Sequence, residues 1–255
     1  METHEMKATP VPLDAAKRLA ETIGRSDGHR AFVEAILARF PWRAKLPREV
    51  LDRDYLRIVD HHLARLLPHV QRFLDPSVRK VLDFGCGSGG SAIALALVYP
   101  GVHCCGTDID GAEIAVARER AELYGVGDRC QFLHVEAGRP LPFPDNSFDY
   151  CQCSSVLEYA TDEEVRRFCV QEMARLVKPG GLLFVSVPNR LYPFEIHTRK
   201  WGWNYFPARL RARIVDSSYW EVRRLARPVV LVPHRTPLSQ FFTPWSNFCL
   251  KKLPV

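Results

Sequence analysis

The sequence contains no Cys-x-x-Cys pair, no long apolar run and no lysine directly after its glycine-rich stretch. Without repeated short spacings, its eight cysteines predict neither a metal site nor a disulfide framework, and we expect reduced, buried thiols. The longest apolar window, residues 92–98, is too short to span a bilayer. The N-terminus lacks the basic start and apolar core of a secretory signal, so we expect a cytoplasmic protein.

The charge of the chain is concentrated toward one end. The net charge is +6, and residues 190–255 contain twelve Lys and Arg against three Asp and Glu. The same segment holds four of the five tryptophans. A basic, aromatic tail suits an anionic or lipid-like partner, such as a membrane surface, and a solvated basic face is the alternative. Nothing in the sequence indicates the oligomeric state.

The first part of the chain has a helical pattern, and 255 residues are enough for one well-buried core with additions. Apolar residues at three- and four-residue spacing predict that residues 1–77 form an N-terminal helical lid. Helices are expected at 14–23, 27–40 and 47–74, the last with an interruption near Pro68.

Residues 78–189 alternate between strands and helices and predict the core. Buried strands in such alternation indicate an α/β fold with a doubly wound, mostly parallel, Rossmann-like sheet. The expected strands are 80–84, 102–107, 130–135, 148–153 and 182–187. The expected helices are 91–99, 111–124 and 161–177. The last helix should begin with a capping box at Thr161–Glu164 and end before the turn residues Pro179, Gly180 and Gly181.

The pattern loosens after Asn189. Residues 190–255 predict a substrate-side, C-terminal extension packed on the core. We expect one basic helix near 207–215 and a strand at 229–232, followed by a C-terminal stretch that prolines interrupt.

The segment Val81–Gly90 reads VLDFGCGSGG and turns an apolar strand into a glycine-rich loop. Ligands bind at the carboxyl ends of parallel strands, and glycine lets a ligand contact bare backbone. A nucleoside triphosphate loop needs Gly-Lys-Ser/Thr, whereas the helix here opens Ser-Ala-Ile-Ala. Gly85, Gly87 and Gly90 satisfy the dinucleotide pattern GxGxxG, with Asp108 about twenty residues further on. The loop alone therefore leaves a dinucleotide and other nucleosides open.

Asp83, two positions before the first glycine, distinguishes these ligands. A carboxylate beside the loop repels a pyrophosphate in a poorly solvated crevice and favours a ligand with positive charge. S-adenosylmethionine carries an ammonium and a sulfonium and no phosphate. Asp83 can hold its amino end, and Asp108 can accept hydrogen bonds from its ribose hydroxyls. Asp110 is the better cap for the following helix, which leaves Asp108 available.

Residues 81–189 resemble the class I S-adenosylmethionine-dependent methyltransferases. The resemblance rests on the segments LDFGCGSG, GTDID, LPFPDNSFDYCQCSSVLEY and EMARLVKPGGLLFVSVPN, in this order, and covers less than half of the chain. It implies a Rossmann-like enzyme that uses S-adenosylmethionine as its cofactor.

The resemblance also implies roles for individual residues. It places Asp83 and the loop around the methionine moiety, Asp108 at the ribose, and Ile109 against the adenine. Relatives often have an acid four residues before Leu-Pro-Phe, where this chain has Ala137 next to Glu136. Either Glu136 or a backbone group therefore meets the adenine. The full set of expected cofactor contacts is Asp83, Gly85, Cys86, Gly87, Gly89, Asp108, Ile109, Glu136, Ala137 and Ser154, with Ser155 as the alternative to Ser154 at the reaction site.

The best candidates for a general base lie after the fifth expected strand. Glu195 and His197 are two residues apart, so in an extended backbone both face the same side. A carboxylate beside an imidazole raises its basicity and fixes its tautomer. A structural role for this pair is the alternative. His61 and His62 in the helical region are weaker candidates.

The acceptor is expected to be a small molecule. In-line alignment supplies much of the acceleration of methyl transfer, and a base is needed only where the acceptor holds its proton at neutral pH. We expect a hydrophobic or aromatic acceptor methylated at oxygen, with C- or N-methylation as the alternative. Nucleic-acid methylation is disfavoured, because CSSVLEY after the fourth strand lacks the Asn/Asp-Pro-Pro-aromatic motif. A non-catalytic protein that kept the fold is the third alternative.

Overall fold

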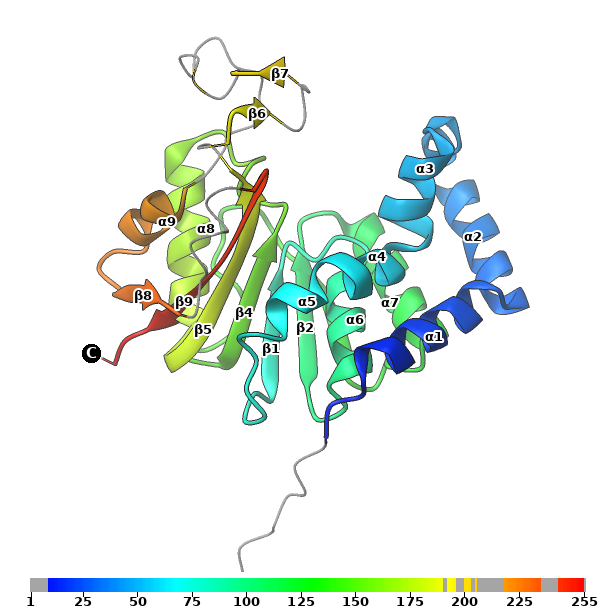
Figure 1. Ribbon diagram of the computed structural model, residues 1–255, viewed down its shortest axis with the longest axis horizontal. Helices are drawn as coiled ribbons and strands as arrows, with labels where there is room; N and C mark the ends of the chain where they lie inside the picture. The colour runs from blue at the N-terminus through cyan, green and yellow to red at the C-terminus, as the bar shows by residue number, and fades with distance from the viewer. Residues whose placement is uncertain are drawn as a thin grey trace, which may run out of the picture. The chain divides into compact units, whose positions relative to one another are not determined.

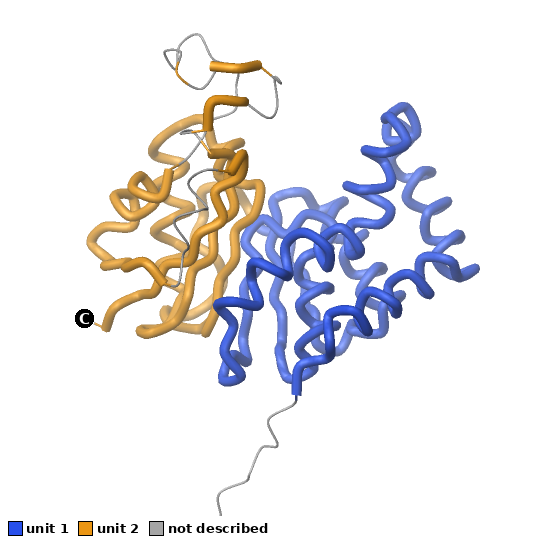
Figure 2. The backbone as a smooth tube through the Cα atoms, in the orientation of Figure 1, with its two compact units in different colours: residues 1–135 blue, residues 136–255 orange. Residues whose placement is uncertain are grey.

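The computed structural model describes residues 9–189, 192–195, 200–202, 205, 218–234 and 243–254 (Figure 1). The chain divides into two compact units, residues 1–135 and residues 136–255 (Figure 2). This division reflects compactness, and the domain boundaries expected after residues 77 and 189 remain a prediction.

The N-terminal segment is helical, as the sequence predicts. Helices α1 (Leu13–Gly24) and α2 (Asp27–Arg39) fall within a residue of their expected bounds. The single long helix expected next is instead a series of short elements: η1 (Pro41–Lys45), α3 (Arg48–Leu51), η2 (Asp52–Leu56), α4 (Ile58–Arg65) and α5 (Leu67–Val70). Element η2 is a π-helical turn. Pro68 lies in the first turn of α5, where its missing N–H costs nothing, so the break precedes it.

The rest of the first unit contains three parallel strands in the order β3-β2-β1. Helix α6 begins directly after the glycine loop, and every one of its residues is buried, because Ala, Leu and Ile occupy all of its faces. The elements are β1 (Lys80–Phe84), α6 (Gly90–Val98), β2 (His103–Asp108), α7 (Gly111–Leu123) and β3 (Cys130–His134). In the parallel register Asp83 pairs with Gly106, so the carboxylates of Asp83 and Asp108 lie at the same edge of two neighbouring strands.

The second unit contains two parallel strands followed by two antiparallel ones, in the order β4-β5-β9-β8. A separate two-stranded hairpin, β6-β7, follows β5. The elements are β4 (Phe148–Ser154), α8 (Glu163–Leu176), β5 (Val177–Pro188), β6 (Phe194–Glu195), β7 (Lys200–Trp201), α9 (Tyr219–Leu225), β8 (Leu231–Pro233) and β9 (Trp245–Lys252).

Three details of this unit differ from the sequence prediction. Asp162, rather than Thr161, caps α8, because its carboxylate accepts the Glu164 N–H at 2.6 Å. Strand β5 begins at Val177, so the expected turn at Pro179 lies inside the strand. Strand β9 was not predicted. The helix expected at 207–215 lies outside the described residues.

The strands and helices of the two units form an α/β, Rossmann-like fold in which most strands run parallel, which confirms the predicted fold class. All eight cysteines are free, and seven of them are buried. Burial raises the pKa of the Cys105 thiol to about 12, with Asp83 contributing. Cysteines in such surroundings stay protonated and unreactive. In the described part of the chain, no helix is long and apolar enough to cross a bilayer.

Candidate functional site

The glycine loop between β1 and α6 is held in a left-handed conformation. Gly85, Gly87 and Gly89 have φ values of 73°, 50° and 80°. Residues other than glycine adopt such angles only with strain. The N–H groups of Gly85 and Cys86 donate to the carbonyl oxygen of Thr107 at 2.8 and 3.0 Å. The loop is therefore fixed against the end of β2.

Two of these glycines serve different purposes. A Cβ built on Gly87 would meet no atom within 4 Å, so the backbone here borders open space. A Cβ on Gly89 would lie 2.8 Å from the Phe132 ring and 2.9 Å from Ala117. Gly87 thus leaves room for a ligand to approach the backbone, whereas Gly89 is required by the packing beneath the loop.

Asp83 lies beneath the loop with only 1% of its surface exposed. Its carboxylate accepts a hydrogen bond from the Ser91 hydroxyl in the first turn of α6. The N-terminus of a helix carries partial positive charge and ordinarily attracts phosphate. In this protein a carboxylate already lies at that position. A phosphate placed there would be repelled at short range in a poorly solvated site.

Asp108 connects the loop to the end of β2. Its Oδ2 accepts the Gly87 N–H at 2.8 Å, and its Oδ1 accepts the Asp110 N–H at 2.9 Å. Each carboxylate oxygen has two lone pairs, so both keep acceptor capacity for a ligand hydroxyl. Asp110 caps α7 by accepting from the backbone N–H groups of Ala112 and Glu113, which confirms that Asp110 is the cap of this helix. Ile109 follows with 63% of its surface exposed.

The first unit therefore offers a donor set that fits S-adenosylmethionine. Asp108 provides acceptors for a ribose diol, Gly87 provides bare backbone, and Ile109 provides an exposed apolar surface for a base. The Asp83 carboxylate supplies negative charge where a cationic amino acid moiety would lie. The same set does not suit a pyrophosphate.

The remaining expected cofactor contacts lie in the second unit. Glu136 forms an exposed ion pair with Arg139 at 2.7 Å, and Ala137 is exposed. Ser154 ends β4, and Ser155 follows with a φ of 59°, which is uncommon for a residue with a side chain. Such strain often marks functional positions.

The expected catalytic pair lies at the limit of the described residues. Glu195 belongs to the short strand β6, which pairs with Lys200 in β7. His197 lies outside the described residues. Their partnership therefore stays a prediction.

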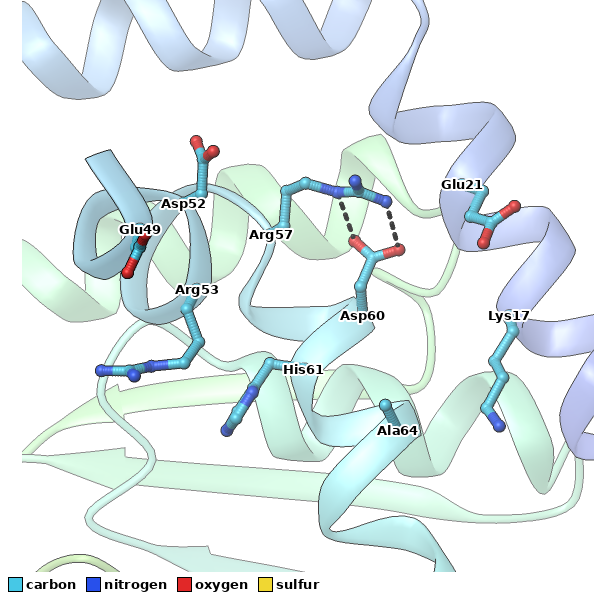
Figure 3. A pocket seen from close by; sticks show the side chains of 9 residues that line it. All are labelled: Lys17, Glu21, Glu49, Asp52, Arg53, Arg57, Asp60, His61 and Ala64. Carbon is cyan, nitrogen blue, oxygen red and sulfur yellow. Dashed lines mark hydrogen bonds and ion pairs between the residues drawn. The ribbon is translucent and has the colours of Figure 1, made fainter.

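The N-terminal helices line an open pocket of about 420 Å³. Figure 3 shows the guanidinium of Arg57 joined by hydrogen bonds to the carboxylate of Asp60 among the lining residues. The lining residues, from α1, α3, η2 and α4 and the residue between the last two, are Lys17, Glu21, Glu49, Asp52, Arg53, Arg57, Asp60, His61 and Ala64. Eight of these nine side chains are charged or titratable.

The two adjacent histidines of α4 face different surroundings. His61 lines the pocket, and burial lowers its pKa, with Arg53 and Arg65 adding to the effect. His62 contacts the start of α6, because a Cβ on Gly90 would lie 2.8 Å from its ring. Burial, together with His61 and Arg120, lowers the pKa of His62 to about 3. His62 is therefore neutral at physiological pH and packs beside the glycine loop.

Sequence reasoning missed Gln152, which is fully buried in β4. Neither its amide oxygen nor its amide nitrogen has a hydrogen-bond partner among the described residues. A buried amide without partners is unusual in proteins. Gln152 lies only two residues before Ser154. No sequence pattern signals it, because glutamine in a strand ordinarily faces solvent.

Carboxylates at the ends of two adjacent parallel strands beside a glycine loop are the arrangement expected of an α/β nucleoside-binding domain. Residues 81–181 match the family model described as a methyltransferase domain. This part of the chain is a domain of the class I S-adenosylmethionine-dependent methyltransferases, and S-adenosylmethionine is the cofactor of that domain.

Individual relatives agree with this family. The chain is 29% identical to a demethylmenaquinone methyltransferase of Geobacillus kaustophilus, over 64% of this chain and 68% of the relative. It is 34% identical to a 27-O-demethylrifamycin SV methyltransferase of Amycolatopsis mediterranei, over 43% of this chain and 40% of the relative. Across the matched relatives the chain spans between 27% and 68% of their length.

A solved structure supports the fold alone. The S-adenosylmethionine-dependent methyltransferase SibL, solved in its apo form, superposes with a TM-score of 0.56 at 17% identity. The match covers 89% of this chain and 70% of that one.

Proposed function

We propose that the protein transfers the methyl group of S-adenosylmethionine to a small, hydrophobic or aromatic acceptor, most readily at oxygen. The observation that carries the proposal is the buried Asp83 carboxylate at the N-terminus of α6, which favours a cationic nucleoside over a phosphate. The bound cofactor would supply an electrophilic methyl group. The acceptor atom forms a bond to that carbon as the carbon–sulfur bond breaks, and the electron pair stays on sulfur.

The residues of the chain then have distinct tasks. Asp108 orients the ribose, Gly87 lets the methionine moiety approach the backbone, and Ile109 covers one face of the adenine. Glu136 or the backbone at Ala137 meets the adenine edge. Ser154, at the end of β4, faces the reacting end.

The acceptor class is supported by the names of relatives. They include a demethylmenaquinone methyltransferase and a 27-O-demethylrifamycin SV methyltransferase, both named for small-molecule acceptors. Other relatives are named as O-, C- and N-methyltransferases. We propose O-methylation, for which a general base is required because a phenol or alcohol holds its proton at neutral pH. Glu195 and His197 are our candidates for this base.

A test of the reaction uses the full chain with labelled cofactor. Incubation with a panel of phenols, hydroxyquinones and aliphatic amines should give S-adenosylhomocysteine together with a product heavier by one methylene. Product analysis assigns the methylated atom, and a C- or N-methyl product would contradict O-methylation. Cofactor binding without turnover of any acceptor would favour a non-catalytic binding protein. RNA as the methylated species would overturn the small-molecule proposal.

The base is tested separately. His197→Ala should lower kcat and leave the Kd for S-adenosylmethionine unchanged, since the imidazole is assigned to the acceptor and not to the cofactor. Full activity of this variant at neutral pH would place the base elsewhere.

We also propose a cytoplasmic protein that contacts a membrane surface through its C-terminal extension. The thiols, all unpaired, suit a reducing compartment. Trp201 in β7 is 72% exposed, and its ring packs against Phe194 at 5.5 Å. Tryptophan favours the membrane interface, and the basic extension would be attracted to anionic lipid.

The membrane contact is tested by cosedimentation with vesicles of phosphatidylglycerol and phosphatidylcholine. Trp201→Ala should reduce binding, whereas Trp42→Ala, at an exposed tryptophan of η1 outside the extension, is the matched control. Equal binding by the wild type and Trp201→Ala, or none by the wild type, would contradict the proposal.

A further inference from the structure

Arg120, in the last turn of α7, is buried with 1% of its surface exposed. Its two terminal nitrogens donate hydrogen bonds in different directions. Nη1 donates to the carbonyl oxygen of Ser88, and Nη2 donates to the carbonyl oxygen of Tyr55. The guanidinium thus joins two backbone segments that are far apart in the sequence.

The surroundings of Arg120 are unusual for a cation. Within the described residues it has no ion-pair partner, and its guanidinium lies 5.3 Å from the centre of the Phe32 ring. Burial lowers its pKa to about 10, against a smaller opposing effect of Tyr124. An unpaired buried charge is strongly unfavourable unless fixed dipoles compensate it. Here the two backbone carbonyls provide that compensation, so both must stay in place.

Both carbonyls belong to parts of the molecule with special backbone geometry. Ser88 lies in the glycine loop, between the left-handed residues Gly87 and Gly89. Tyr55 lies in η2, the π-helical turn. π-helical turns are rare in proteins, and many of those that occur lie at functional sites. Arg120 therefore connects the candidate cofactor loop to an irregular turn of the N-terminal segment.

A second buried arginine holds the same segment against the same region. Arg43, in η1, is fully buried and forms an ion pair with Glu113 in the first turn of α7. Its guanidinium lies 3.9 Å from the centre of the Phe40 ring and 4.2 Å from that of Tyr55. Residues 41–56, which we name the clamp segment, are thus attached both to the glycine loop and to the helix that follows Asp108.

We propose that Arg120 is a positioning residue for the cofactor. By binding the Ser88 carbonyl, it holds the left-handed glycine loop in the conformation that binds the cofactor. Because Arg120 also binds the Tyr55 carbonyl, that conformation depends on docking of the clamp segment. The proposal rests on the proposed function, since it assigns the loop to S-adenosylmethionine. By reciprocity, a cofactor that needs the ordered loop also stabilises docking of the clamp segment.

The test compares two arginines of the same helix. Arg118 also donates to a backbone carbonyl, that of Phe132 in β3, at 3.1 and 2.7 Å, and has no bond to the loop. Calorimetric titration with S-adenosylmethionine should show that Arg120→Met raises the Kd by roughly tenfold or more and that Arg120→Lys restores part of the affinity. The Kd of Arg118→Met should stay within roughly twofold of wild type. Unchanged affinity in Arg120→Met, or equal losses in Arg118→Met and Arg120→Met, would overturn the proposal.

A second measurement does not depend on the folding of any variant. In the wild-type chain, S-adenosylmethionine should slow hydrogen exchange of backbone amides in residues 52–58 as well as in the glycine loop. The amides of α8 serve as the internal control and should not change. Protection of the loop without protection of residues 52–58 would overturn the proposed coupling between the loop and the clamp segment, but not the proposed function. Absence of any cofactor binding by the wild type would overturn both this inference and the proposed function.

Discussion

The carboxylate of Asp83, in β1, accepts a hydrogen bond from the hydroxyl of Ser91, in the first turn of α6. This contact places negative charge at the positive end of a helix that begins directly after a glycine loop. In phosphate-binding loops the corresponding position is open to the ligand's own negative charge. We therefore expect the charge preference of the loop to be reversed, although its glycine pattern alone resembles that of dinucleotide-binding proteins.

The first prediction concerns Asp108, whose carboxylate holds the Gly87 N–H and is assigned to the ribose. Asp108→Ala should weaken S-adenosylmethionine binding more than roughly tenfold, because a hydrogen bond to a charged group contributes about 1.5–3 kcal/mol. Calorimetric titration measures the effect. Asp110→Ala is the matched control: loss of the α7 cap should lower stability by about 1 kcal/mol with little change in affinity. Wild-type affinity in Asp108→Ala would show that the ribose lies elsewhere.

The second prediction separates the roles of two loop glycines. Gly89→Ala should destabilise the fold, because its Cβ would lie 2.8 Å from the Phe132 ring, and φ is +80°. Gly87→Ala carries only the strain of a positive φ, since its Cβ points into open space, and its main effect should be on cofactor affinity. Thermal unfolding and titration of both variants check this division. Equal stability losses in the two variants would contradict it.

The third prediction concerns pH. The folded protein holds His62 neutral down to about pH 3, whereas the unfolded chain protonates it near its ordinary pKa of 6.5. The unfolded state therefore binds more protons in this window, and the free energy of unfolding falls as the pH drops from 6.5 toward 3. Between neutral pH and about pH 5 the loss due to His62 should be about 1–2 kcal/mol.

Denaturant titrations over this pH range measure the slope. His62→Gln should flatten it, because the variant has no imidazole to protonate in the unfolded chain. A slope that is identical in wild type and His62→Gln would show that the pKa of His62 is the same in the folded and the unfolded chain.

The fourth prediction concerns the buried amide of Gln152. Its two polar atoms have no partner among the described residues, so Gln152→Met should raise the free energy of unfolding by about 1–2 kcal/mol. Gln171→Met is the control, because the Gln171 amide donates to the Arg227 carbonyl at 2.8 Å and its loss should be neutral or slightly destabilising. A large stability loss in Gln152→Met would mean that the amide holds a buried water or a ligand group.

The regular elements of the core follow from the sequence because each has a clear periodicity and a clear end. Strand β1 and helix α7 match their predicted bounds within a residue. Strand β9 escaped prediction because WSNFCLKK follows a proline-rich stretch and ends in two lysines. The structure buries one of them: the ammonium of Lys252 donates to the carbonyl oxygens of Ala174 and Val177. These acceptors are distant in sequence, so no local pattern reveals them.

The candidate site shows the same limit. Residue types and order were enough to select Asp83 and Asp108, because carboxylates at strand ends beside glycines have a direct chemical meaning. Their contacts with Ser91 and Gly87 depend on the turn between them and are visible only in three dimensions. Arg120 looks in the sequence like an ordinary helix-surface residue, and its burial depends on η2, whose π-helical turn no periodicity predicts.

The most direct measurement of the charge preference is a set of parallel calorimetric titrations of the wild-type chain with S-adenosylmethionine, NAD and ATP under one buffer condition. We expect saturable binding of S-adenosylmethionine at a single site and no measurable heat from either phosphate-bearing nucleotide. Tighter binding of NAD or ATP than of S-adenosylmethionine would contradict the account.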